Sequence, residues 1–347
     1  MGIMPHRDID RVLKLALSLD IPFWPQLPNV SIYEDMYVQV SQNFPGIAVN
    51  FDKERLVFDT ARFEQELDEY FMKMDCPETF ALTKEYSAVF HKFLSEELRG
   101  YKAIRGQVIG PVSFGFKVLD ESLKPIIYND RARAVLFDFI QKKVNIQYQE
   151  LKKRNPNAFV WLDEPGLGYV FSGLSGYNEQ QAKEDYHDFL EGLEGPKGLH
   201  LCADVNLPYL LELGVEILSF DAYQIEFMPK EYTSSVAEFL KSGGVISWGI
   251  IPTESTILAT QTPETLAAIL SDYWEIISQN TGLSLNQTAE QALVAPARCC
   301  LKDIGQVSTA TEVMGKCQVA SIEERLVEKA FAFLPELSQI LRDKYGL

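Results

Sequence analysis

The stretch GLHLCADVN, residues 198–206, places a histidine and a cysteine two positions apart inside an apolar run. Side chains two apart on a β-strand leave the same face, so His200 and Cys202 would point to one side of a sheet. Imidazole nitrogen and thiolate sulfur are ligands that zinc accepts. A core histidine beside a buried thiol would give the same pattern, because cysteine also packs as a small apolar side chain.

Polar residues of the same kind follow other apolar runs. Asp163 and Glu164 follow AFVWL, Asp221 follows VEILSF, and Cys299 follows ALVAPAR. The carboxyl ends of parallel strands in a barrel meet at one mouth, so these side chains would converge although they are distant in sequence.

The three predicted metal ligands are His200, Cys202 and Cys299. Together they would hold zinc with its fourth position open to substrate, as in catalytic zinc sites. Asp221 would either be a fourth ligand that yields to substrate or support the other ligands. Zinc deprotonates a bound thiol outright, which favours alkylation of a thiol. Two thiolate ligands make the metal a weaker Lewis acid, so zinc-assisted hydrolysis ranks lower.

The elements that would position these residues alternate along the chain. Seven short apolar runs, nearly all followed by helical patterns, indicate a parallel sheet covered by helices: 21–28, 103–111, 158–166, 197–205, 215–224, 244–254 and 292–300. Residues 1–6 are a candidate eighth strand. We therefore expect an α/β fold in which residues 1–347 form a single (β/α)8 TIM barrel, with residues 30–100 as a helical insertion after the second strand. A doubly wound nucleotide-binding sheet is disfavoured, because neither glycine-rich phosphate motif is present.

The amino-acid composition argues against some classes of binding partner. The 347 residues include 49 Asp and Glu against 32 Lys and Arg, for a formal net charge of −17. This acidity argues against nucleic acids and anionic membranes as partners. No apolar run is long enough to span a bilayer, and five cysteines do not form an obvious disulfide framework. We expect a cytoplasmic protein.

The same segments carry a family resemblance. GLHLCADVNLPYLLELGVEILSFDAYQ and VAPARCCLKDIG resemble the zinc-ligand segments of cobalamin-independent methionine synthase, and WLDEPGL and VIGPVSFG resemble two of its other motifs. The superfamily includes uroporphyrinogen decarboxylase and the zinc methyltransferases that move methyl groups from corrinoid proteins to thiols. The resemblance implies zinc at His200, Cys202 and Cys299, and an amino-group contact at Asp163. Asp221 stands where the family has a glutamate ligand.

Two hypotheses follow. The first is a zinc-dependent methyltransferase that moves a methyl group to a small thiol, with cobalamin or methyltetrahydrofolate as methyl donor and a corrinoid protein as a candidate partner. Asp163 and Asp221 would be its catalytic residues, and Gln26, Asp163 and Glu164 would bind substrate. The second is a barrel that binds a corrinoid or tetrapyrrole without methyl transfer. Ile3 motivates it, because it replaces a serine that holds the amino acid in methionine synthases.

Overall fold

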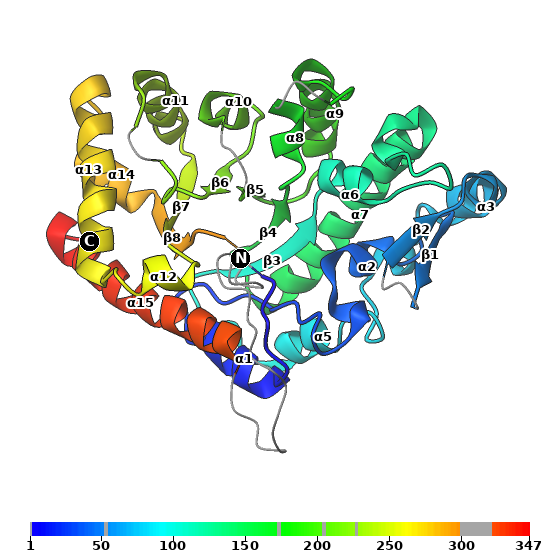
Figure 1. Cartoon of the computed structure of the whole chain (residues 1–347), viewed down its shortest axis with the longest axis horizontal. Helices are drawn as coiled ribbons and strands as arrows, with labels where there is room; N and C mark the ends of the chain where they lie inside the picture. Colours follow the sequence, from blue (N-terminus) through cyan, green and yellow to red (C-terminus); the bar gives the residue numbers. More distant parts are fainter. Residues whose placement is uncertain (1, 52–54, 172–174, 203–205, 226–227, 299–320) are drawn as a thin grey trace.

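A curled sheet of six parallel strands forms the centre of the molecule (Figure 1). The computed structural model describes residues 2–51, 55–171, 175–202, 206–225, 228–298 and 321–347. The strands follow the chain in the order β3-β4-β5-β6-β7-β8. Their bounds are β3 (Ile104–Ile109), β4 (Ala158–Asp163), β5 (Lys197–Leu201), β6 (Ile217–Phe220), β7 (Val245–Ile251) and β8 (Ala292–Pro296). These six strands confirm six of the apolar runs that the sequence indicated.

The first two expected strands are reduced to isolated parallel bridges in the described residues. Phe23 pairs with Arg105 of β3, and Ile3 pairs with Gln26. Beyond β3 the sheet therefore continues through single residue pairs and not through complete strands. The physical reason lies in the prolines of this region, such as Pro22 and Pro25, which lack the N–H group that a ladder requires. The structure therefore shows a six-stranded half-barrel where the sequence suggested eight complete strands.

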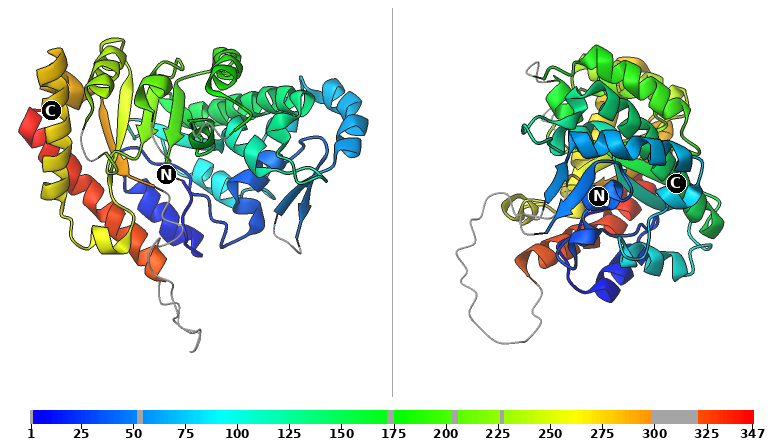
Figure 2. Two further views of the ribbon diagram at one scale, coloured as in Figure 1. Left: turned by 45° about the horizontal axis from the view of Figure 1, so that its top comes forward. Right: turned by 90° about the vertical axis from the view of Figure 1, so that its right-hand side faces the viewer.

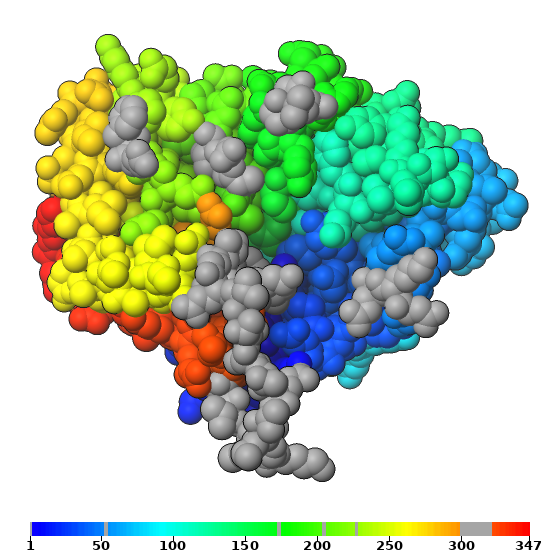
Figure 3. Space-filling model, in the orientation of Figure 1, coloured from blue at the N-terminus to red at the C-terminus, as the bar shows by residue number. Residues whose placement is uncertain are grey.

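Helices cover the outer face of the sheet, as expected for parallel strands (Figure 2). α7 packs against β3 and β4, α11 and α13 pack against β7, and α15 packs against β8. The bounds in the second half of the chain are α6 (Pro111–Lys117), η2 (Ile126–Tyr128), α7 (Asp130–Arg154), α8 (Leu167–Phe171), α9 (Glu179–Glu191), α10 (Leu207–Leu211), α11 (Lys230–Lys241), α12 (Ser255–Leu258), α13 (Pro263–Thr281), α14 (Leu285–Glu290) and α15 (Ile322–Tyr345). In the space-filling view α12 and α13, in yellow, lie above α15, in red (Figure 3).

Residues 30–100 are not purely helical. They include a two-stranded antiparallel hairpin, β1 (Ile47–Asn50) and β2 (Arg55–Phe58), which lies with α3 on the side of the molecule away from α13 and α15 (Figure 1). The helices of the first hundred residues are α1 (Ile9–Leu17), η1 (Ile32–Glu34), α2 (Met36–Ser41), α3 (Thr60–Lys73), α4 (Pro77–Phe80) and α5 (Ala88–Ser95). The helical expectation for this segment therefore missed the hairpin.

Side-chain caps mark the starts of three helices. Thr262 caps α13, with Pro263 as the first helical residue, and Ser321 forms a reciprocal capping box with Glu324 at the start of α15. Asn178 caps α9 by accepting a hydrogen bond from the backbone N–H of Gln181. None of the described helices is long and apolar enough to cross a membrane.

Candidate functional site

One row of polar side chains crosses three neighbouring strands near their carboxyl ends. The register pairs Asp163 of β4 with His200 of β5, and His200 with Ser219 of β6. Residues at one level of a parallel sheet share a face, so these three side chains leave the sheet together. All three are buried, with exposed fractions of 6%, 2% and 1%. Fold topology thus brings a carboxylate, an imidazole and a hydroxyl side by side.

The His200 ring is held from two sides. Its Nδ1 lies 2.9 Å from Ser219 Oγ, and the ring stacks on Trp161 with centroids 5.5 Å apart and an interplanar angle of 21°. Its Nε2 is buried and has no hydrogen-bond partner among the described residues. Burial, together with the charge of Arg105, lowers the pKa of His200 well below its usual value, so the imidazole is neutral at pH 7. A neutral imidazole with one nitrogen fixed and the other unpartnered has the form of a metal ligand.

Asp163 has an unsatisfied carboxylate oxygen. Its Oδ2 is buried and has no hydrogen-bond partner in the part of the chain that the structure describes. Burial raises the pKa of Asp163 to about 6, and the nearby charge of Arg105 opposes that shift. At pH 7 the group is largely ionised, so it can attract a cationic or hydrogen-bond-donating part of a ligand.

Cys202 follows the last residue of β5 and is partly exposed. Burial, followed by the charge of Asp163, raises the pKa of the Cys202 thiol to about 11, and Asp221 acts in the same direction. The thiolate is the reactive and metal-binding form of cysteine. The Cys202 thiol would therefore stay protonated at neutral pH unless a cation bound to its sulfur.

Asp221 is engaged by protein groups. Its carboxylate accepts hydrogen bonds from Arg298 Nε at 2.6 Å, from the backbone N–H of Gln224 at 3.2 Å, and from the Gln224 side chain. The carboxylate thereby fixes the residue that directly precedes Cys299. Cys299 itself, the third predicted metal ligand, lies outside the described residues.

Glu164 is engaged by the protein on another element, α6. Its carboxylate accepts hydrogen bonds from the backbone N–H groups of Val112 and Ser113, at 3.0 and 2.7 Å, from Ser113 Oγ and from the Tyr186 hydroxyl. It thus binds the first turn of α6 and ties it to α9. All four hydrogen-bond donors are protein groups, so Glu164 holds α6 and α9 together. The sequence predicted substrate binding for this residue and did not predict this structural role.

Gln26, the other predicted substrate-binding residue, lies in the bridge segment before β3. Its side-chain N–H donates to Gln39 Oε1 at 2.8 Å, while its own Oε1 is buried and has no partner. It borders a small internal cavity beside Lys143 and Glu150. The structure therefore does not place Gln26 in the row formed by Asp163, His200 and Ser219.

Two of the three predicted metal ligands, His200 and Cys202, lie in the part of the chain that the structure describes. His200 Nε2 has no hydrogen-bond partner among the described residues, and Cys202 directly follows the last residue of β5. Within the described ranges, however, neither belongs to a set of three ligand atoms lying within 4.8 Å of one another; the set that does so is His187, Asp188 and Glu191, exposed on α9. A complete site would need Cys299.

Arg105 was missed in the sequence. It lies on β3 between Phe23 and Trp161, with its guanidinium carbon 4.6 and 3.8 Å from the two ring centroids. Its Nη1 donates to Gln107 Oε1 at 2.9 Å. Alternation within AIRGQVIGP could have revealed it, because residues 105 and 107 share one face of an otherwise apolar strand.

Comparison with known proteins supports the fold. No family model matches the sequence, and no curated protein matches it significantly. Among solved structures, the chain is similar to a candidate vitamin-B12-independent methionine synthase from Listeria monocytogenes, with a TM-score of 0.55 and 11% sequence identity over 98% of this chain and 86% of that one. At this identity the likeness shows a shared fold.

Proposed function

We propose that this protein is a zinc-dependent methyltransferase that moves a methyl group from a methylcorrinoid or methylfolate donor to a small thiol. The observation that carries the proposal is His200: a buried, neutral imidazole whose Nδ1 is held by Ser219 and whose Nε2 has no partner. Such a ring, two residues from a cysteine at a strand end, suits a metal ligand better than a core residue. The shared fold with a candidate methionine synthase agrees with it.

In this proposal His200 and Cys202 hold zinc together with Cys299. When bound, zinc would lower the pKa of a substrate thiol so that its sulfur is a thiolate at neutral pH. The sulfur attacks the methyl carbon, a C–S bond forms, and the bond from that carbon to the donor breaks with its electron pair left on the donor. The thiol proton passes to solvent.

Protein side chains would orient the thiol. Asp163 belongs to the same row as His200, and its buried Oδ2 has no hydrogen-bond partner among the described residues. This oxygen would therefore bind a cationic group of the thiol substrate. Asp221 would act through Arg298, whose position fixes the start of the Cys299 segment. We also propose that the segments around Ile3 and Phe23 serve as the first two strands of a barrel, because their bridges continue the parallel order of the sheet.

The proposal is tested by metal content and methyl transfer. Protein purified without chelators should contain one zinc per chain by elemental analysis, and His200→Gln and Cys202→Ser should each lose it. The same two variants should lose methyl transfer from methylcobalamin or methyltetrahydrofolate to a panel of thiols. Cys76→Ser is the matched control, because Cys76 is an exposed free thiol.

Two outcomes would count against methyl transfer. Absence of zinc from the purified protein, together with no zinc uptake on titration, would remove the metal site. Tight binding of cobalamin without methyl transfer to any thiol would instead favour the alternative of a corrinoid-binding barrel.

A further inference from the structure

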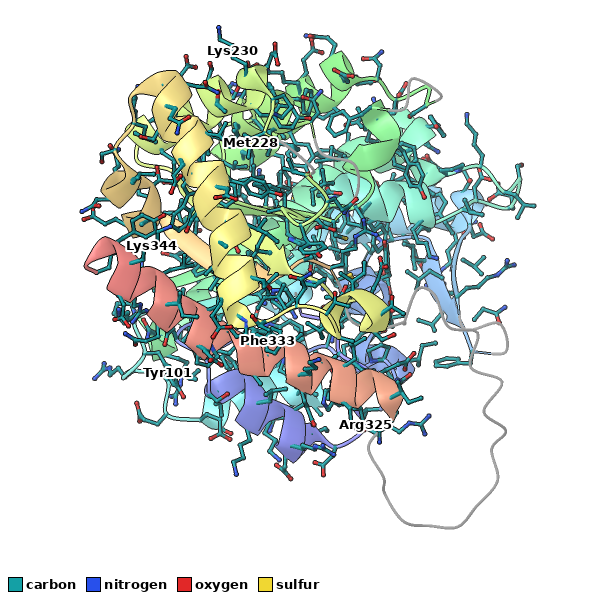
Figure 4. The ribbon with its side chains drawn as sticks, turned by 60° about the vertical axis from the view of Figure 1, so that its left-hand side comes forward. Tyr101, Met228, Lys230, Arg325, Phe333 and Lys344 are labelled. Atoms are coloured by element: carbon teal, nitrogen blue, oxygen red, sulfur yellow. The ribbon has the colours of Figure 1, made fainter. Side chains whose placement is uncertain are left out.

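A second cavity lies on the side of the sheet where β8 forms the edge. Its volume is about 550 Å3, and it runs between β8, α15 and residues 18–23. Lys102 and Phe159, near the amino ends of β3 and β4, also line it. α15 covers the cavity from outside; Arg325 and Lys344 mark the two ends of this helix, with Phe333 between them (Figure 4). The volume falls within the range of small-molecule sites, ~300–1,000 Å3.

The inner wall of this cavity contains a buried cation. Arg105 is 4% exposed and lines the cavity. The Phe23 and Trp161 rings pack against its guanidinium, and Gln107 accepts one hydrogen bond from its Nη1. Within the described residues no carboxylate lies within 4.0 Å of its guanidinium nitrogens. Burial lowers its pKa to about 9, so it remains charged at pH 7. The charge of Asp163 opposes this shift but forms no ion pair with the guanidinium, so the buried cation still lacks the direct partner that an anionic ligand would supply.

The other charges of the cavity lie at its rim. Asp20 and Arg342 neutralise each other in an exposed ion pair of 2.8 Å. Lys102 and Glu290 remain, one of each sign. The net charge of the five ionisable lining residues is therefore +1, carried by Arg105, although the whole chain carries −17.

Apolar side chains form the remainder of the wall. Val294 of β8 and Phe331, Leu334 and Leu341 of α15 face the space from opposite sides. An apolar ligand body would replace water against these surfaces, with a stabilisation of ~25 cal/mol per Å2 buried.

We infer that this cavity binds a small organic carboxylate with an apolar body, its carboxylate bound by Arg105 and its body packed between β8 and α15. Gln107 accepts one hydrogen bond from Arg105, and the remaining N–H groups of a guanidinium can donate two parallel hydrogen bonds to a carboxylate. This inference does not rest on the zinc proposal: in that scheme Arg105 contacts neither the metal nor the thiol, although its charge acts on the pKa values of His200 and Asp163.

The test uses octanoate and its uncharged counterpart octanamide, with affinity measured by calorimetry. Octanoate should bind at least tenfold more tightly than octanamide. Arg105→Gln should weaken octanoate at least tenfold and leave octanamide little changed. Ser338→Trp, which fills the cavity from α15 without touching Arg105, should abolish binding of both. Arg131→Gln, an exposed arginine on α7, is the charge-matched control.

The zinc content of each variant shows whether the metal site is intact, and its circular dichroism shows whether it is folded. Loss of octanoate binding can then be told apart from loss of the metal site or of the fold. Equal affinities for octanoate and octanamide, or no binding of either to the native protein, would overturn the inference. Unchanged octanoate binding in folded Ser338→Trp would also overturn it, because the ligand would then lie elsewhere. If Arg105→Gln fails to fold, Ser338→Trp and the octanamide comparison still decide the matter.

Discussion

His200 Nδ1 and Ser219 Oγ lie 2.9 Å apart on neighbouring strands, at the same level of the sheet. This contact fixes which nitrogen of the imidazole is left for a ligand. An outer partner of this kind fixes the tautomer and the ring orientation of a metal-binding histidine.

Ser219→Ala should therefore weaken zinc binding by ~10–100-fold without unfolding the protein. Competition with a chromophoric chelator measures that affinity. Ser247→Ala is the matched control, because Ser247 is the register partner of Ser219 on β7 and is equally buried. Identical zinc affinities for the two variants would show that Ser219 does not orient His200.

Removing the charge of Asp163 and removing that of Glu164 should change the free energy of unfolding by different amounts. Glu164→Gln replaces a carboxylate that accepts four hydrogen bonds with an amide that can accept fewer, so buried donors lose partners at ~1–3 kcal/mol each. Asp163→Asn removes a charge whose Oδ2 has no partner, and should change the free energy of unfolding much less. Urea denaturation at pH 8 compares them. A larger loss in Asp163→Asn would contradict the structural assignment of Glu164.

Much of this fold could be predicted because its signals are local. Apolar runs specify β3–β8, and cap residues specify the starts of α9, α13 and α15. The prolines beside Phe23 prevented complete strands there, and the hairpin β1–β2 is too short to show a clear alternation. The sequence of residues 30–100 therefore predicts a helical insertion and gives no signal for this hairpin.

The candidate site was also predictable only where its signals are local in the sequence. Alternation within β5 put His200 and Cys202 on one face, and the register added Asp163. The task of Glu164 depends on Ser113 and Tyr186, which are 51 and 22 residues away in sequence, so no local pattern could reveal it. The partner of Asp221 is still more distant: Arg298 lies 77 residues further along the chain.

Breaking the Asp221–Arg298 pair should destabilise the protein. Asp221 is 2% exposed, and Arg298 Nε donates to it at 2.6 Å. Asp221→Asn should lower the free energy of unfolding by ~1–3 kcal/mol, the range for hydrogen bonds to charged groups. Asp20→Asn breaks the exposed pair with Arg342 and should cost less than ~1 kcal/mol. Denaturant midpoints of the two variants give the comparison, and equal losses would show that Asp221 is not a structural anchor.

Lys143 should make stability depend on pH. Its Nζ is buried on α7 without a hydrogen-bond partner, beside a cavity of about 20 Å3 that has room for roughly one water. Burial lowers the pKa of Lys143 from 10.5 to about 7. Between these values the unfolded chain binds a proton that the folded chain does not, so the free energy of unfolding rises with pH, by up to ~1 kcal/mol per pH unit from this group. Below pH 7 both states are protonated and this contribution becomes constant.

Lys143→Met should abolish that slope and raise stability at pH 7, because no amine then needs to lose its proton on folding. Urea denaturation at pH 7, 8, 9 and 10 measures the slope for each protein. Lys153→Met, at an exposed position on the same helix, removes the same charge and should keep the native slope. A native-like slope in Lys143→Met would mean that the buried amine is not the group responsible, and that the pKa of Lys143 is not depressed in the folded protein.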